Sequence, residues 1–184
     1  MNKKYLVIIV LIVIVAVSLI GSYNSLVTKE EKVNSAWAQV ENVLKRRADL
    51  IPSLVNTVQG YASHESDVLT GITEARSSFN DANTPDEYAE ANTELNRALT
   101  NLYVVVENYP ELKANKNFSD LQYELAGTEN RISTERMRYN ETVQEFNTSI
   151  KRIPTNIIAN VFGFEEKQYF EINEEDAEVP EVNF

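Results

Sequence analysis

The stretch VNSAWAQVENVL, residues 33–44, decides the fold class of this chain. Its stripe of large apolar residues falls at Val33, Trp37, Val40 and Leu44, spaced by four, three and four positions. That spacing places the four side chains on one face of an α-helix. The stretch therefore predicts an amphipathic helix whose apolar face is covered by other parts of the chain.

Upstream of this helix lies a continuous apolar run, YLVIIVLIVIVAVSLI, at residues 5–20. As a helix it rises about 24 Å, and the small residues that follow it can complete a span of about 30 Å of hydrocarbon. Tyr23 then suits the membrane interface. A cleaved signal peptide is the alternative, with residues 16–18 as the cleavage site. We expect an uncleaved single-pass anchor in the cell membrane, inserted through residues 5–20.

The charges that flank the apolar run indicate its orientation. Lys3, Lys4 and the free amine precede it, whereas Lys29 and Lys32 follow it beside two glutamates. Acidic residues count little in the positive-inside rule, so the N-terminal side carries the slightly larger positive charge. We therefore expect the N-terminus in the cytoplasm and the helical domain outside it.

Three more apolar stripes at helical spacing follow, over residues 58–79, 88–109 and 118–150. The third stretch begins at Thr84-Pro85-Asp86-Glu87, which combines a capping box with proline at the first helical position. Long helices joined by short loops favour an antiparallel up-and-down bundle. If Pro52 only kinks the chain, the first two stretches form one helix and three helices remain. We expect a break at Pro52, and therefore four helices.

These patterns predict an all-α protein, with an N-terminal transmembrane helix followed by a long antiparallel up-and-down four-helix bundle. The expected boundaries are residues 1–23 for the anchor, 24–164 for the bundle and 165–184 for an acidic tail. The tail holds eight acidic residues and one lysine, so it carries −7 of the net charge of −11. A chain this acidic is not expected to bind nucleic acid, because phosphate binding needs a basic patch.

The residue types leave little room for catalysis. The chain has no cysteine and one histidine, which excludes disulfides, zinc–thiolate sites and thiol nucleophiles. His64-Glu65 begins like the zinc motif HExxH, but Val68 stands where the second histidine would be. We expect no catalytic residues, no metal site and no cofactor, and thus a binding or scaffolding module instead of an enzyme.

Charged residues interrupt the apolar stripes at several points. Glu65 and Arg76 occupy stripe positions in the second stretch, and Glu129 and Arg136 flank the fourth stripe. Because lone buried charges are costly, we expect these residues to pair, and we expect Glu65 and Arg76 to be buried and charge-compensated. Two interpretations stay open: an ion network that fixes the register of the helices, or a polar cavity that binds a small anion or a peptide group.

Two further segments bear on the surface of the bundle. We interpret residues 45–47 (KRR) as the solvated, positively charged end of the first helix, with contact to lipid headgroups as the alternative. The apolar residues 157–164 (IIANVFGF) either cap the bundle or lie on the bilayer surface, and we expect the cap.

The chain ends in PEVNF, an alternating pattern that would expose Val182, Phe184 and the terminal carboxylate on one side of an extended strand. Peptide-binding grooves recognise C-termini of this kind. If the bundle lies outside the cytoplasm, a PDZ-bearing envelope protease or assembly factor is a candidate partner. The alternative is that Val182 and Phe184 fold back onto the bundle.

Several longer motifs occur in order along the chain: AWAQVENVLKRRADLIPSLVNTVQGYASHE at residues 36–65, ENYPELKAN from Glu107, TENRI from Thr128 and RMRYNETVQEFN from Arg136. With the ending PEVNF, they resemble the LemA family of bacterial membrane-anchored proteins, from about Tyr23 to the C-terminus. The resemblance implies a membrane helix, a long helical bundle and no established activity. It also implies other envelope proteins as partners, a membrane protease among them. We expect a scaffold or adaptor, the alternative being an envelope sensor or ligand-binding module that uses the polar core.

Overall fold

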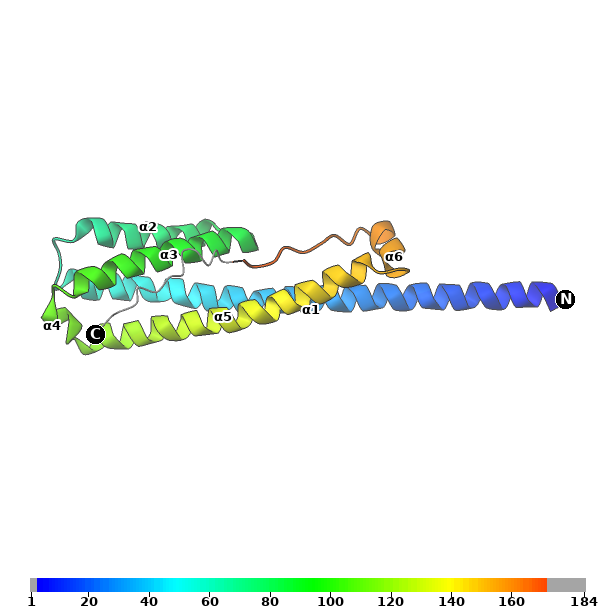
Figure 1. Cartoon of the computed structure of the whole chain (residues 1–184), viewed down its shortest axis with the longest axis horizontal. Coiled ribbons are helices and arrows are strands. Elements are labelled where there is room, and N and C mark those ends of the chain that lie inside the picture. The colour runs from blue at the N-terminus through cyan, green and yellow to red at the C-terminus, as the bar shows by residue number, and fades with distance from the viewer. Residues whose placement is uncertain (1–2, 172–184) are drawn as a thin grey trace. The chain divides into compact units, whose positions relative to one another are not determined.

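The computed structural model describes residues 3–171, and this part of the chain is all-helical (Figure 1). The all-α prediction is confirmed, and no strand occurs within the described residues. Four of the helices are long and two are short. In chain order the helices are α1 (Lys3–Gln59), α2 (Ser66–Asp81), α3 (Pro85–Val106), α4 (Pro110–Lys113), α5 (Lys116–Lys151) and α6 (Thr155–Phe162).

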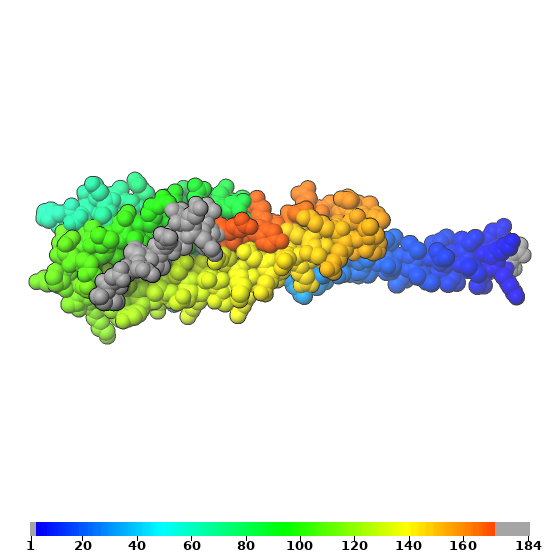
Figure 2. All heavy atoms as spheres, in the orientation of Figure 1, coloured from blue at the N-terminus to red at the C-terminus, as the bar shows by residue number. Residues whose placement is uncertain are grey.

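Helix α1 is a single helix of 57 residues, about 86 Å long at the usual rise per residue. Its apolar segment, residues 5–20, is exposed along its whole length. Figure 2 shows the blue N-terminal residues without a neighbouring segment on the face drawn. By length and composition, α1 is the one helix within residues 3–171 that could cross a membrane.

The described residues form two compact units. The first contains residues 3–38 and 138–168, and the second contains residues 39–137 and 169–171. Both α1 and α5 contribute a segment to each unit. The boundaries at residues 23 and 164 that composition suggests stay a prediction.

In the first unit, α1 and α5 run antiparallel. Trp37 packs against Tyr139 with ring centroids 5.2 Å apart, and Lys29 forms an ion pair with Glu145 at 2.7 Å. The chain after α6 returns along α5, where the Asn147 side chain binds the backbone of Lys167 through both its amide nitrogen and its oxygen, each at 2.9 Å. These contacts fix the returning segment against α5.

In the second unit, α2, α3 and α4 and segments of α1 and α5 enclose an apolar core. Figure 1 shows α2 and α3 side by side, and Phe79 and Tyr88 pack across them with ring centroids 6.4 Å apart. Residues 82–84 join the two helices, and the predicted capping box between Thr84 and Glu87 is present at the start of α3. The fully buried residues include Val40, Leu44, Leu54 and Val58 of α1, Ile72 of α2, Leu95 and Leu102 of α3, Leu112 of α4 and Ile132 of α5.

The predicted break at Pro52 is wrong, because Pro52 lies inside α1. The helix ends at Gln59, and beyond it the amides of Tyr61 and Ala62 both donate to the carbonyl of Val58. The number of long helices is still four, since the first turn of the chain falls at residues 60–65 instead of at the proline.

Candidate functional site

A buried arginine lies at the centre of the second unit. Arg47 is carried by α1, and only 3% of its surface is exposed. Its neighbours along the helix explain its position: Leu44 precedes it by three residues and Ile51 follows it by four, and both are buried. Arg47 therefore occupies one position of the apolar stripe, which carries its guanidinium into the space between α1, α3 and α5.

Three side chains from two other helices bind the guanidinium. Arg47 Nη1 donates to Asn92 Oδ1 at 2.6 Å and to Glu129 Oε2, and Nη2 donates to Asn96 Oδ1 at 2.5 Å. Asn92 and Asn96 are four residues apart on α3 and so share one face of that helix, while Glu129 belongs to α5. We call these four residues the arginine cluster.

The cluster combines one fully buried charge with a partly solvated counter-charge. Burial lowers the pKa of Arg47, and the nearby Glu129 carboxylate opposes that effect. Burial likewise raises the pKa of Tyr103 of α3, and this side chain lies close to Arg47. The Glu129 side chain is 41% exposed, so water reaches the carboxylate but not the guanidinium. The arginine is therefore the member of the pair that depends on protein partners.

Two donors of the cluster have no acceptor among the described residues. They are Nε of Arg47 and Nδ2 of Asn92, both of which are buried. Asn92 is wholly buried. A buried donor of this kind binds an oxygen acceptor when one can reach it, because an unmade hydrogen bond costs about 1–3 kcal/mol.

Residues 36–184, most of the chain, match the family model described as LemA family. The chain belongs to the LemA family. This result confirms the resemblance that the sequence motifs indicated.

Three curated proteins are similar to this LemA-family chain. Magnetosome proteins MamQ 1 and MamQ 2 of Paramagnetospirillum magneticum are each 25% identical to it over 180 residues, covering 84% of this chain and 66% of the relative. Protein LemA of Metamycoplasma hominis is 25% identical over 159 residues, covering 84% of this chain and 71% of the relative. The chain thus spans slightly under two thirds of the length of the MamQ proteins.

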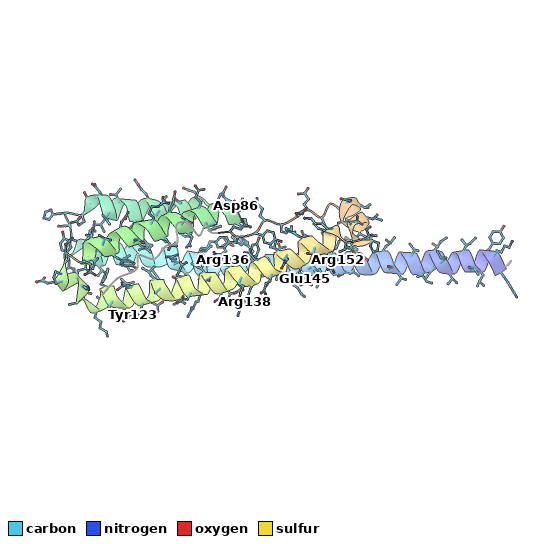
Figure 3. All side chains as sticks on the ribbon, in the orientation of Figure 1. Asp86, Tyr123, Arg136, Arg138, Glu145 and Arg152 are labelled. Carbon is cyan, nitrogen blue, oxygen red and sulfur yellow. The ribbon has the colours of Figure 1, made fainter. Side chains whose placement is uncertain are left out.

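Of the four polar residues that sequence analysis singled out in this LemA-family chain, only Glu129 belongs to the arginine cluster. Arg136 is half-buried and follows Glu129 on α5 (Figure 3), about 10 Å further along the helix. Glu65 and Arg76, which we expected to be buried, are half-buried. Glu65 accepts a hydrogen bond from the Tyr109 hydroxyl at 2.8 Å, and Arg76 donates to the carbonyl of Ala48 at 3.1 Å. Within residues 3–171, both side chains are therefore partnered by neutral groups.

Arg47 was not among the predicted site residues because it lies in the run KRR, which we interpreted as a solvated helix end. Arg46 has that character: its side chain is 54% exposed and pairs with Glu124 at 3.0 Å. The signal that distinguishes the two arginines is register, since Arg47 continues the spacing Val40, Leu44, Arg47 and Ile51. Asn92 gives the same signal in α3, four residues after Tyr88 and three before Leu95.

Two other expectations concern metals and the C-terminus. Within residues 3–171, no group of three or more histidine or acidic residues is placed to hold a metal ion. Val182 and Phe184, the candidate C-terminal recognition residues, lie outside the described residues.

Proposed function

We propose that this LemA-family chain is a membrane-anchored helical scaffold or adaptor. The observation that carries the proposal is the continuity of α1, which runs without a break from an exposed apolar segment into the helices of the second unit. A helix of this kind holds the polar domain close to the bilayer and leaves the outer faces of its helices free for partners. The site of action is then the cell membrane, with the helical domain outside the cytoplasm.

The outer face of α3 offers one surface for a protein partner. A shallow groove of about 360 Å³ there is lined by several carboxylates, among them Asp86, Glu90 and Glu94, together with Arg97 (Figure 3 labels Asp86). A partner with a basic segment fits this surface by charge, because complementary charges steer association and fix the register of a complex. Envelope proteins, including a membrane protease, are the proposed class of partner.

Membrane attachment is tested with charges placed in the apolar segment. Val10 and Ile14 are exposed on α1, so replacing both with lysine leaves the packed helices intact, while each lysine costs about 2.5–3.5 kcal/mol near the centre of a span. The full-length chain should stay in the membrane fraction after alkaline extraction, and the double variant should leave it. Val104→Lys, at an exposed apolar position of α3, is the matched control and should stay in the membrane.

The scaffold role is tested by photo-crosslinking in cells. A crosslinking residue at Glu90, in the groove, should give a discrete adduct with one protein, and the same residue at Val104 should not. The adduct should disappear in the Val10→Lys, Ile14→Lys variant, because the partner then no longer shares the membrane. Equal labelling at both positions would contradict a defined docking surface.

A second candidate function, a ligand-binding module, is favoured by the arginine cluster. The buried donors on Arg47 and Asn92 suit a small ligand with oxygen acceptors, such as a carboxylate. Thermal unfolding of the full chain in detergent with acetate, phosphate or short peptides tests this function. A concentration-dependent rise in melting temperature that is lost in Asn92→Ala would favour it over the scaffold, whereas no rise with any probe would reject it.

A further inference from the structure

The helix α6 belongs to the first unit and lies beside the end of the apolar segment of α1. Phe162, the last residue of α6, packs against Tyr23 with ring centroids 4.7 Å apart, and Phe164 packs against the same ring at 5.8 Å. Tyr23 follows Ile20, the last residue of the apolar segment, by three positions, which is about 4.5 Å along the helix axis. The α6 helix is therefore level with the first helical turn beyond that segment.

Helix α6 is apolar on two sides, and only one of them is covered. Ile158 and Ala159 are buried against the rest of the unit. On the other side, Ile157 and Val161 are four positions apart and are 57% and 72% exposed, and Ile153, in the turn before α6, is 83% exposed. In Figure 2 the orange residues of α6 lie at the surface on the face drawn. The sequence-based expectation that residues 157–164 cap the helices accounts for the buried side but not for the exposed one.

The charges around α6 suit a membrane surface. Residues 153–164 contain no charged side chain. Arg152, which follows α5, is exposed (Figure 3), and its side chain forms no ion pair within the described residues. On the other side of α6, the exposed Glu165 and Glu166 follow Phe164, and Glu166 pairs with Lys151 at 2.8 Å. A helix with an apolar face, bounded by a free cation, lies in the headgroup region of a bilayer with its apolar side chains about 5–10 Å below the surface. Aromatic side chains such as Tyr23 are enriched at the same depth.

We propose that α6 is a second membrane contact, which inserts Ile157 and Val161, together with Ile153 of the preceding turn, into the bilayer interface beside the anchor. The inference rests on the proposed anchoring of residues 5–20, since that segment brings α6 to the level of the headgroups. We assign a lipid surface to this face because it adjoins the apolar segment of α1. The contact between Phe162 and Tyr23 joins the exposed apolar side chains of α6 to that segment. The chain then touches the membrane through two helices, one across it and one along it.

Depth-dependent fluorescence quenching tests this proposal. The chain has no cysteine, so a single introduced cysteine carries the only thiol-reactive dye. Full-length Val161→Cys, Val10→Cys and Val104→Cys variants are labelled with an environment-sensitive dye and reconstituted in phosphatidylcholine–phosphatidylglycerol vesicles. All three side chains are exposed, so the substitutions disturb no packing. Quenchers are lipids that carry a spin label either at the headgroup or deep in the acyl chain.

We expect the dye at position 161 to be blue-shifted and quenched most strongly by the headgroup label. The dye at position 10 should be quenched most strongly by the deep label, and the dye at position 104 by neither. If position 10 is quenched and position 161 behaves like position 104, α6 does not touch the bilayer, although the anchor stands. If position 10 also escapes quenching, the anchor fails and the role of α6 fails with it.

Discussion

Arg76 of α2 donates its Nε–H to the backbone carbonyl of Ala48 in α1, with 3.1 Å between nitrogen and oxygen. In an α-helix the carbonyl of Ala48 accepts from the residue four positions later, and that residue is Pro52, which has no N–H. The arginine therefore supplies the donor that the proline removes. This bond accounts both for an intact α1 around Pro52 and for a charged residue in the apolar stripe of α2.

The first prediction is that the contributions of Arg76 and Pro52 to stability are coupled. Arg76→Met keeps the apolar stem and removes the donor, so it should lower the free energy of unfolding by about 1 kcal/mol. Pro52→Ala restores the helical N–H to Ala48, and in that background Arg76→Met should cost clearly less. A double-mutant cycle, measured by denaturant unfolding of the full chain in detergent, gives the coupling energy.

The exposed Arg131 of α5 supplies the control for this cycle. Arg131→Met should change stability little in either background, because surface substitutions are usually within about 0.5 kcal/mol. Equal costs of Arg76→Met with and without Pro52 would show that the bond to Ala48 does not compensate for the proline.

The second prediction concerns the arginine cluster, where the two halves of one ion pair should differ. Glu129→Gln leaves the buried guanidinium of Arg47 without its counter-charge and should cost roughly 3 kcal/mol. Arg47→Met leaves a carboxylate that is 41% exposed and that water can solvate, so it should cost less, about 1–2 kcal/mol, mainly through the lost bond to Asn92. Unfolding free energies of the two variants give the comparison.

The neighbouring pair Arg46 and Glu124 is the matched control, since both side chains are more than half exposed. Removing either of them should change stability by at most about 1 kcal/mol. A larger loss for Arg47→Met than for Glu129→Gln would mean that the burial of Arg47 does not determine the energetics of the cluster.

The spacing of apolar residues predicted most of the fold, and the deviations have physical causes. The stripe of Val33, Trp37, Val40 and Leu44 and the capping box at Thr84 are both local signals, and both predictions hold. The carbonyl that Pro52 leaves without its helical donor is bonded by Arg76, which is 24 positions from Pro52 in the sequence, so no local rule predicts the contact. Glu129 was identified from its stripe, whereas Arg47 was hidden by the basic residues beside it.

The third prediction is a pH dependence in the first unit. The hydrogen bond from Lys29, and then its charge, lower the pKa of Glu145 (labelled in Figure 3) below its usual value of 4.5. A carboxylate with a lowered pKa contributes stability above its unfolded-state pKa, and that contribution is lost as the pH falls through the folded-state value. The stability difference between wild type and Glu145→Gln should therefore be present at neutral pH and shrink below pH 4.5. A difference that is constant across this range would exclude the ion pair as its source.

The fourth prediction addresses orientation in the membrane. A single cysteine at Val104 is exposed on α3, and the proposed topology places it outside the cytoplasm. A membrane-impermeant maleimide should label it in intact spheroplasts as fully as in permeabilised ones. Labelling only after permeabilisation would reverse the assigned orientation and leave the anchor in place.

The unbroken course of α1 has a consequence for how the protein responds to its lipid environment. Each residue of an α-helix turns the chain by about 100° and advances it by about 1.5 Å, so one residue inserted after Ile20 would rotate Tyr23 and every later position of α1 about the helix axis. Bilayers of different thickness change the tilt of a spanning helix. Because residues 3–38 of α1 pack with residues 138–168 in one compact unit, a tilt of the proposed anchor would move that unit with it, and lipid composition would become a mechanical input to the unit.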